Sequence, residues 1–420
     1  MAVLPNDDWR PARPQPGHRL QLLQGGEAFF PALVAAMDAA AQSVHLETYI
    51  FDFAGSSLQV AEALVRAARR GVHVRLVVDG IGTPHIPEAW RQRFSEAGVY
   101  WRVYAPLGRF GMALPSSWRR LHRKLCVVDG RVGFCGGINI IDDLNDVALG
   151  RLSLPRLDFS LQVSGPLVAD MAETMERLWW RLQAVRKARQ REFRAAWDAL
   201  RTGTPVGDFS ALFDLGDTPR PGPSRGMAHA GSAALVLRDN LRHRHDIERA
   251  YLKAIGEAHH EVLIANAYFI PGRKLRRALV MAVSRGVRVR LLLQGKYEHF
   301  MQYHAARPVF HQLLSAGVQI FEYVPSALHA KVAVVDRRWA TVGSTNLDPL
   351  SLLLAREANV VSADEGFARA LHERLHHIVT HDGRALQPQA LAARPWPQRA
   401  LDRLAFMVMR ASLFLTGHRY

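Results

Sequence analysis

A histidine and a lysine recur in the same uncommon pattern at two places in the chain. Residues 121–140 read LHRKLCVVDGRVGFCGGINI, and residues 328–347 read LHAKVAVVDRRWATVGSTNL. In both, the lysine stands two positions after the histidine and an aspartate five positions after the lysine, before a Gly-Gly or Gly-Ser pair and an asparagine. One such match is common by chance in a long protein, whereas two complete copies indicate shared chemistry.

Imidazole and ammonium groups at this spacing suit reactions at a phosphodiester. If each motif begins as a strand, its histidine and lysine point to the same face. The lysines would stabilise the negative charge that grows on the phosphoryl oxygens. One imidazole could attack phosphorus to form a phosphohistidine, while the other protonates the leaving alcohol and then deprotonates the incoming one. These candidate catalytic residues are His122, Lys124, His329 and Lys331.

The remaining motif residues are expected to support this chemistry. Strand alternation places Asp129 and Asp336 on the opposite face, where each would hold the local turn, and we count both with the candidate catalytic residues. Glycine allows the backbone to approach closely, and asparagine adds amide donors. The candidates for phosphate binding or support of the site are therefore Gly137, Asn139, Ser344 and Asn346.

Each half also offers a carboxylate downstream of its histidine. Asp158 lies in RLDFSLQVSGP, after His122, and Glu357 lies in REANVVSAD, after His329. A carboxylate often orients a catalytic imidazole, so we include both as candidate supporting residues. A plain surface carboxylate is the alternative for each. Because cationic side chains already supply the charge, we expect neither a metal nor another cofactor.

The repeat extends beyond the motifs. ETYIFD (47–52) and VHVRLVVDG (72–80) precede the first motif, and NAYFIP (266–271) and VRVRLLLQG (287–295) precede the second. The repeating order is strand, helix, strand, helix, strand and motif strand, which predicts an α/β fold. We expect two similar lobes, each a mostly parallel or mixed sheet flanked by helices. A pseudo-twofold axis would relate them, with the active site between them.

This organisation gives four predicted regions. The first lobe spans 1–200, a Gly/Pro-rich linker spans 201–233, the second lobe spans 234–390, and an apolar and basic segment that associates with a membrane spans 391–420. The segment at 391–420 could instead pack on the protein's own core.

The net charge limits the classes of partner, and the cysteines indicate the compartment. The net charge of +16 should attract anions: nucleic acid, an acidic membrane or a phosphorylated substrate. Cys126 and Cys135 both lie in apolar runs, so buried free thiols and a reducing compartment are expected. The N-terminus does not read as a signal peptide, and no stretch of about 18 apolar residues predicts a membrane span.

The double motif and its surroundings resemble the phospholipase D superfamily, from about residue 18 to 385. GSTNLDPLSLLLAREAN and LLQGGEAFFPAL are similar to the bacterial cardiolipin synthase B group in particular. The resemblance implies two phospholipase-D-like lobes and transfer of a phosphatidyl group from one phosphatidylglycerol to the head-group hydroxyl of a second phospholipid, releasing glycerol. It also implies His122 as the nucleophile and His329 as the general acid and base, although the repeat symmetry leaves the reverse open.

Two other functional classes stay open at this point. A hydrolase of the same fold, either a phospholipase D or a nuclease, is the main alternative. A catalytically inactive membrane scaffold is the other, and the two complete motifs argue against it. The leading hypothesis places the protein peripherally on the cytoplasmic face of the bacterial inner membrane. Its partners would be anionic phospholipids, with phosphatidylglycerol as substrate and cardiolipin as product, and no nucleic acid.

Two further segments carry signals of their own. The stretch 107–120 separates the third strand from the first motif and is predicted to be a lid or a membrane-contacting element. Its apolar residues are Phe110, Met112, Leu114 and Trp118. HERLH at 372–376 matches the HExxH zinc motif, but no third ligand follows at a known spacing. We interpret it as the polar face of a helix that closes the second lobe.

Overall fold

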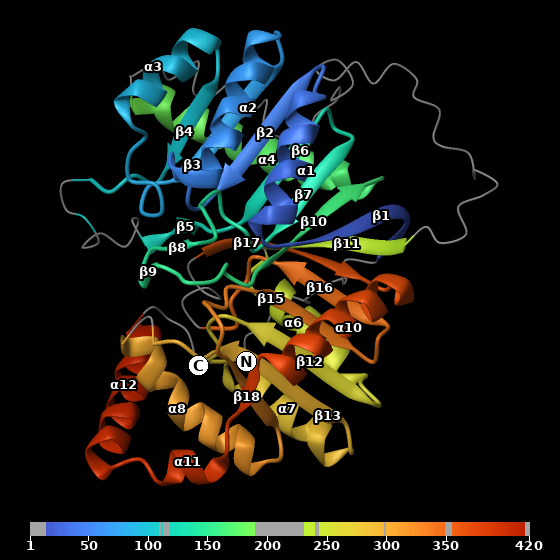
Figure 1. Ribbon diagram of the computed structural model, residues 1–420, viewed down its shortest axis with the longest axis vertical. Helices are drawn as coiled ribbons and strands as arrows, with labels where there is room; N and C mark the ends of the chain where they lie inside the picture. Colours follow the sequence, from blue (N-terminus) through green and yellow to red (C-terminus); the bar gives the residue numbers. More distant parts are fainter. Residues whose placement is uncertain are drawn as a thin grey trace, which may run out of the picture.

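The computed structural model describes residues 14–108, 111, 118–189, 231–239, 243–297, 300–348 and 355–415. Two lobes of similar construction lie one above the other in Figure 1. Each contains a sheet with helices packed on it, as the repeat predicts. The predicted linker 201–233 lies outside the described residues up to 230, and the second lobe begins with a strand that starts at Gly231.

The first lobe follows the predicted order of strands and helices. Its elements are β1 (Gln15–Gln24), α1 (Gly25–Asp38), β2 (Ser43–Thr48), α2 (Leu58–Arg69), β3 (His73–Asp79), α3 (Glu88–Ala97), β4 (Tyr100–Tyr104), β5 (Arg120–Leu121), β6 (Lys124–Val128), β7 (Val132–Gly136), β8 (Asn145–Asp146), β9 (Gly150–Arg151), β10 (Phe159–Ser164) and α4 (Leu167–Arg189). The first motif occupies β6, β7 and the residues that flank them.

The second lobe repeats this order and extends it with helices at its C-terminal end. Its elements are β11 (Gly231–Arg238), α6 (Asp246–Gly256), β12 (Glu261–Asn266), α7 (Arg273–Ser284), β13 (Arg288–Gln294), α8 (Phe300–Ser315), β14 (Gln319–Tyr323), β15 (Lys331–Val335), β16 (Trp339–Gly343), β17 (Ala355–Ser362), α10 (Glu365–His381), β18 (Gly383–Ala385), α11 (Pro388–Ala392) and α12 (Trp396–Leu415). The second motif occupies β15, β16 and their flanks.

One mixed sheet runs through both lobes. Its strand order is β18-β14-β13-β12-β15-β16-β17-β11-β1-β10-β7-β6-β2-β3-β4, so the pairing of β11 with β1 joins the halves. β2, β3 and β4 run parallel, as do β12, β13 and β14, and each motif strand pairs antiparallel with the first strand of its set. The order is nearly symmetric about the β11–β1 pair, which confirms the predicted fold class and its repeat.

The motif strand β6 is apolar on both faces because it separates two cores. Cys126 and Val128 pack into a core between the sheet and helices α1 to α3. Leu125 and Val127 point the other way, into a core to which both lobes contribute, together with residues of α4 and α10. A third core lies between the second-lobe sheet and α6 to α8. The core shared by both lobes fixes how they dock, because burying apolar area is the main favourable term in folding.

Both cysteines are buried, and the C-terminal helix packs on the second lobe. Cys126 and Cys135 are free and buried, which confirms the expected thiols. Helix α12 packs on α8, where Asp402 Oδ1 lies 2.6 Å from His304 Nδ1 and Met409 is buried. Packing on the core therefore accounts for one face of this helix. No helix among the described residues combines the length and apolar character needed to span a bilayer.

The aspartates of the two motifs lie at the far ends of their strands. Asp129 follows β6 with a φ of +50° and accepts the backbone N–H groups of Ala41, Gln42 and Ser43 at 2.9, 2.8 and 2.8 Å. Asp336 accepts three N–H groups before β12 in the same way, at 2.7 to 2.8 Å. Each carboxylate thus holds the loop that leads into the neighbouring strand. These contacts support the expected role in holding a turn, and a catalytic role for either aspartate stays a prediction.

We predict that Asp129→Ala lowers stability and leaves chemistry intact. The substitution removes the acceptor of three backbone N–H groups, which should lower the free energy of unfolding by about 1–3 kcal/mol. Asp336→Ala should behave alike, and chemical denaturation measures both. A folded Asp129→Ala protein with normal stability but no turnover would contradict this role.

Candidate active site

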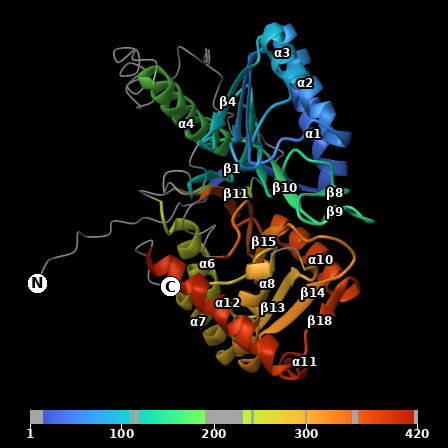
Figure 2. The same cartoon turned by 90° about the vertical axis from the view of Figure 1, so that its left-hand side faces the viewer.

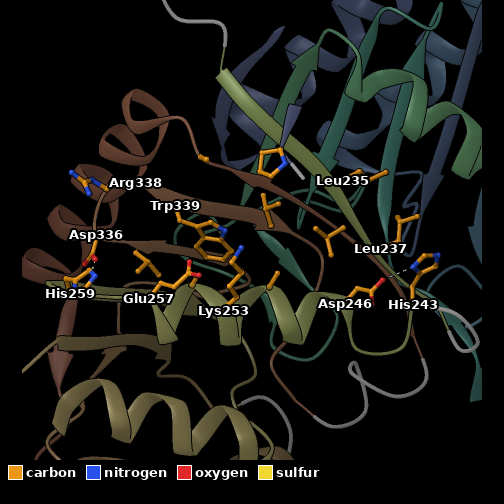
Figure 3. A pocket seen from close by; sticks show the side chains of 17 residues that line it. Leu235, Leu237, His243, Asp246, Lys253, Glu257, His259, Asp336, Arg338 and Trp339 are labelled. Carbon is orange, nitrogen blue, oxygen red and sulfur yellow. Dashed lines mark hydrogen bonds and ion pairs between the residues drawn. The ribbon is translucent and has the colours of Figure 1, made fainter. Parts of the chain in front are cut away.

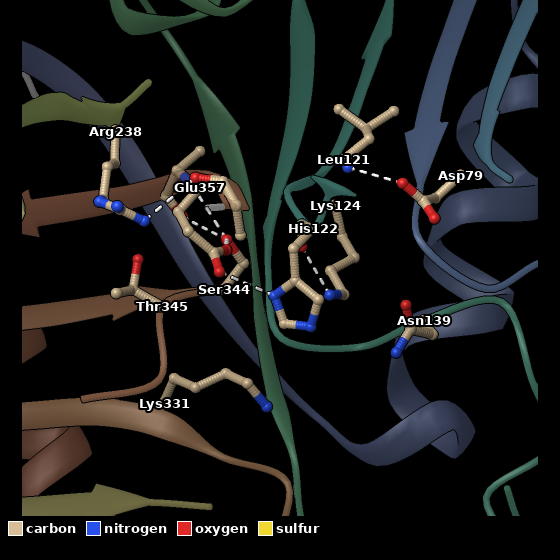
Figure 4. A network of polar contacts seen from close by, with 12 residues as sticks. Asp79, Leu121, His122, Lys124, Asn139, Arg238, Lys331, Ser344, Thr345 and Glu357 are labelled. Carbon is tan, nitrogen blue, oxygen red and sulfur yellow. Dashed lines mark hydrogen bonds and ion pairs between the residues drawn. The ribbon is translucent and has the colours of Figure 1, made fainter. Parts of the chain in front are cut away.

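Each motif histidine is held by a carboxylate from the other lobe. His122 Nδ1 lies 2.9 Å from Glu357 Oε1, and His329 Nδ1 lies 2.6 Å from Asp158 Oδ2 (Figure 4 shows the first pair). The sequence identified these carboxylates but associated each with the histidine of its own half. The structure exchanges the partners, so both pairs cross the boundary between the lobes.

Backbone hydrogen bonds explain why the pairs cross. The N–H of His122 donates to the carbonyl of Arg356 at 3.0 Å, where β5 pairs in parallel with the start of β17. In the other half, the N–H of His329 donates to the carbonyl of Leu157 at 2.8 Å, and the N–H of Leu157 donates to Ala327 at 2.9 Å. Each histidine segment is therefore bonded to the segment that carries the other lobe's carboxylate, which is β17 for Glu357 and the residues just before β10 for Asp158.

The Gly-Gly and Gly-Ser pairs shape the carboxylate sites. A Cβ atom at Gly137 would stand 2.2 Å from Asp158 Oδ1, so only glycine leaves room for this carboxylate. Asp158 Oδ1 also accepts the N–H of Phe159 at 2.8 Å. At the equivalent position, Ser344 donates its hydroxyl to Glu357 Oε2. These two residues, predicted to support the site, do so by holding or accommodating the carboxylates.

The motif lysines are buried beside the histidines. Lys124 Nζ donates to the carbonyl of His122 at 2.6 Å, and Lys331 Nζ donates to the carbonyl of His329. In Figure 4 the two ammonium groups point from different lobes into the space around the His122 ring. Burial lowers the pKa of Lys124 to about 7, and the charge of Lys331 acts in the same direction. An anion that entered this space would favour the charged form of Lys124, because its negative charge would offset the two ammonium groups.

The motif asparagines are buried near the same space. Asn139 Oδ1 accepts the N–H of Ile50 at 3.2 Å, so its amide nitrogen is the end turned away from Ile50. Asn346 is equally buried at the equivalent position of the second motif. Their place agrees with the predicted role as donors, which stays a prediction for the bound phosphate.

Burial also sets the protonation of the histidine pairs. It lowers the pKa of His122, and it lowers the pKa of His329 well below the usual value, with the charge of Lys331 adding to the effect. Burial raises the pKa of Asp158 to about 6. At neutral pH each imidazole is thus neutral and can donate Nδ1–H to its carboxylate. That tautomer leaves the Nε2 lone pair available to attack or to accept a proton.

Two residues that the sequence did not single out fix the residue before each histidine. Asp79, at the end of β3, accepts the N–H of Leu121 at 2.7 Å. Gln294, at the end of β13, donates to the carbonyl of Leu328 at 3.3 Å. They occupy the same position in VHVRLVVDG and VRVRLLLQG. Aligning the two repeats beyond the motifs would have found them.

Tyr49 forms part of the wall beside the first histidine. Its ring centroid lies 5.1 Å from the ring of His122 and 5.6 Å from Lys124 Nζ, a favourable position for a cation. Burial and the nearby charge of Asp79 raise the pKa of Tyr49 to about 12, so its hydroxyl stays protonated. In the sequence, ETYIFD marks the repeat, but no spacing in it singles out this tyrosine.

A cavity of about 670 Å³ in the second lobe is not part of this site. It lies between α6 and the sheet and is lined by Leu235, Leu237, Lys253, Glu257 and Trp339, among others (Figure 3). Neither the motif histidines nor their carboxylates contribute to its walls. This cavity is therefore separate from the candidate site between the lobes.

The HERLH segment forms polar contacts of its own. His372 Nε2 lies 2.7 Å from Glu261 Oε2, and His376 Nδ1 lies 3.0 Å from the guanidinium of Arg290. A guanidinium at that place would repel a metal cation. Within the described parts of the chain, no group of three His, Cys, Asp or Glu side chains is arranged to hold a metal. The helix-face interpretation accounts for this segment.

The predicted lid is only partly described. Phe110, Met112 and Leu114 lie outside the described residues, whereas Leu107 is exposed and Trp118 is partly buried. The proposal of a lid over the site therefore stays a prediction.

Comparison with known proteins agrees with this geometry. The family model described as "Cardiolipin synthase, PLD-like domain" matches residues 33–146 and 251–379, one stretch in each lobe. The chain belongs to the cardiolipin synthase family. It is 36% identical over 411 residues to Cardiolipin synthase B of Escherichia coli (strain K12), covering 96% of this chain and 90% of that protein. It is 30% identical over 403 residues to Cardiolipin synthase A of Pseudomonas aeruginosa (strain LESB58), covering 94% and 72%.

A solved structure shares the fold of this family member. The phosphatidylserine synthase of Haemophilus influenzae Rd KW20 aligns with a TM-score of 0.68 at 11% sequence identity, covering 96% of each chain. At that identity the likeness concerns the fold alone. The two-lobed architecture is thus kept although most of the side chains differ.

The crossed pairing predicts which carboxylate controls which histidine. Glu357→Gln should weaken the hold on His122, and Asp158→Asn the hold on His329, because an amide cannot balance an imidazolium. By analogy with other oriented histidines, each change should lower turnover by roughly 10²- to 10⁴-fold. Nitrogen NMR of the ring atoms should show Glu357→Gln shifting the His122 signals and Asp158→Asn those of His329. Shifts in the opposite histidines would refute the crossed arrangement.

Proposed function

We propose that this family member is a cardiolipin synthase that transfers a phosphatidyl group from one phosphatidylglycerol to the head-group hydroxyl of a second phospholipid and releases glycerol. The observation that carries the proposal is that two carboxylate-held imidazoles and two buried lysines lie close together, since the charges of Lys124, Lys331 and His122 all act on the pKa of His329. That set matches the needs of a two-step transfer at phosphorus: a nucleophile, a proton carrier and fixed positive charge. The activity named for its curated relatives supports the choice of lipid.

In the proposed first step, His122 Nε2 attacks the phosphorus of phosphatidylglycerol. A P–N bond forms, the bond from phosphorus to the head-group glycerol oxygen breaks, and His329 gives that oxygen a proton. Glu357 accepts Nδ1–H of His122 and stabilises the positive charge that develops on the ring. Lys124 and Lys331 oppose the negative charge on the phosphoryl oxygens.

In the proposed second step, His329 Nε2 takes a proton from the hydroxyl of the second phospholipid. The hydroxyl oxygen attacks phosphorus, the P–N bond breaks, and His122 returns to its neutral form. His329 must carry a proton in the first step although burial and neighbouring cations lower its pKa in the empty site. A bound phosphate raises that pKa again, because its negative charge offsets the cations around the ring.

We further propose peripheral association with the cytoplasmic face of the bacterial inner membrane. Both substrates are lipids, and the net charge of +16 favours an anionic surface. The two free cysteines agree with a reducing compartment.

The central prediction is that each histidine is essential for turnover. His122→Ala and His329→Ala should each lower cardiolipin formation from phosphatidylglycerol vesicles by roughly 10⁴-fold or more, since the two imidazoles act as a unit. Mass spectrometry of the lipids measures the product, and Asp129→Ala serves as a motif variant outside the site. Turnover should persist in a chelator because lysine supplies the charge.

Three results would contradict parts of this proposal. Near-normal activity of either histidine variant would refute the two-histidine mechanism. Phosphatidic acid as the main product would make the enzyme a hydrolase. A phosphatidyl adduct trapped on His329 instead of His122 would exchange the two roles.

The buried groups predict a narrow pH optimum for kcat/KM. As pH falls through about 6, protonation of Asp158 removes the acceptor that orients His329, so activity should fall. As pH rises through about 7, Lys124 loses its proton and its attraction for phosphate, so activity should fall again. Lys124→Arg should move the alkaline limb upward because guanidinium stays protonated. An alkaline limb unmoved by that change would exclude Lys124 as its source.

A further inference from the structure

Helices α7 and α12 approach each other on the outside of the second lobe, where both neighbour α8. In Figure 2 α12 crosses in front of α8 with α7 beside it, and the guanidinium of Arg276 on α7 lies 5.8 Å from the ring of Phe406 on α12. Their exposed sides form one surface, which we call the α7–α12 surface. It consists of Arg273, Lys274, Arg277, Trp396, Arg399, Arg403, Leu404, Met407, Val408 and Arg410.

The solvent side of α12 is apolar where a surface helix is ordinarily polar. Leu404, Met407 and Val408 are 54%, 58% and 50% exposed, and Trp396 is 74% exposed. These side chains lie opposite the face that packs on α8 through Asp402 and neighbouring apolar residues. Packing on the protein's own core therefore leaves a second apolar face without a partner among the described residues.

The charges of the α7–α12 surface have one sign. Helix α7 reads RKLRRALVMAVS and has no acidic residue, and Arg273, Lys274 and Arg277 are exposed. The acidic residue of α12, Asp402, is buried, lies within hydrogen-bond distance of His304 and forms an ion pair with Arg394. The exposed side of both helices thus offers cations and apolar groups without a compensating carboxylate.

The cations sit close to the apolar side chains. The guanidinium of Arg410 lies 5.9 Å from the ring of Phe406, and the guanidinium of Arg276 lies 5.8 Å from the same ring. A partner must therefore present negative charge and apolar volume within one contact. Nucleic acid would satisfy the charges but leave the apolar groups in water. A second copy of the same surface would oppose cation to cation.

We propose that the α7–α12 surface docks on an anionic phospholipid bilayer. Lipid phosphates would pair with the arginines, while Leu404, Met407 and Val408 enter the boundary between head groups and acyl chains. The proposal deepens the proposed function, on which its choice of lipid rests, by naming the face that meets the membrane.

Docking on this surface would bring the bilayer close to the second histidine segment. Phe300 and Met301, at the start of α8, are exposed, and the ring of Phe300 lies 4.6 Å from His304, which binds α12 through Asp402. Gln294 ends β13, the strand that precedes α8, and its side chain contacts Leu328 beside His329. Lipid head groups at this surface thus stand near the side of the site that contains His329.

The test compares three variants of the full-length protein in vesicle co-sedimentation. Arg399→Gln/Arg403→Gln/Arg410→Gln removes three charges from the surface, and Leu404→Ser/Met407→Ser removes apolar contacts. Arg69→Gln/Arg91→Gln/Arg131→Gln removes the same charge from exposed positions on the first lobe and is the matched control. Vesicles contain phosphatidylglycerol or only phosphatidylcholine, and thermal melting confirms folding.

The expected result is specific loss of binding to phosphatidylglycerol vesicles. The surface triple variant should bind roughly 100-fold more weakly, since each basic residue contributes about a fivefold gain near an anionic surface. The control triple should lose far less, and the apolar variant should bind more weakly at every salt concentration. Phosphatidylcholine vesicles should bind none of the proteins strongly.

Two outcomes would overturn the proposal. Equal loss in the surface and control triples would mean that net charge acts without a defined face. Unchanged vesicle binding of both surface variants, with a change in oligomeric state by light scattering, would assign the face to a second copy of the chain. Turnover of short-chain soluble phosphatidylglycerol, measured on the same proteins, tests the proposed function separately, because it requires the site but no bilayer.

Discussion

The crossed hydrogen bonds between histidines and carboxylates are the constraint on which the site depends. His122 pairs with Glu357 and His329 pairs with Asp158, so neither lobe by itself contains a complete histidine–carboxylate pair. The geometry exists only when the lobes are docked, and docking is secured by the shared apolar core and the β1–β11 pairing. Backbone bonds from each histidine segment to the segment that carries the opposite carboxylate then position the pairs.

The two halves are alike in backbone and different in the groups that surround each imidazole. Asp158 fits beside glycine, whereas the longer Glu357 receives a serine hydroxyl. A charged Asp79 supports the first histidine segment, and a neutral Gln294 supports the second. A two-step transfer requires one nucleophile and one proton carrier, which a perfectly symmetric site would not distinguish. In the proposed mechanism, these side-chain differences on a repeated scaffold would provide that distinction.

Positive charge occurs in two settings, buried in the site and exposed on the α7–α12 surface. Inside the site, burial makes the ammonium form of Lys124 costly until an anion enters, so a phosphate gains more from it than it would at an exposed lysine. On the α7–α12 surface the cations are solvated and long-ranged, and they act with exposed apolar side chains. The first arrangement suits chemistry on a phosphoryl group, and the second suits a large anionic surface.

The sequence by itself determined the repeat, the α/β class and the candidates for the reacting residues. Strand and helix periods and the HxK spacing are local properties, so they can be read along the chain, and so could the carboxylates Asp158 and Glu357. Tertiary structure alone decided that the carboxylates change partners, that Asp129 and Asp336 hold distant loops, and that α12 has a buried and an exposed apolar face. Each of these depends on which segment of one lobe or helix lies against another, and periodicity does not encode that choice because it specifies a face without naming its neighbour.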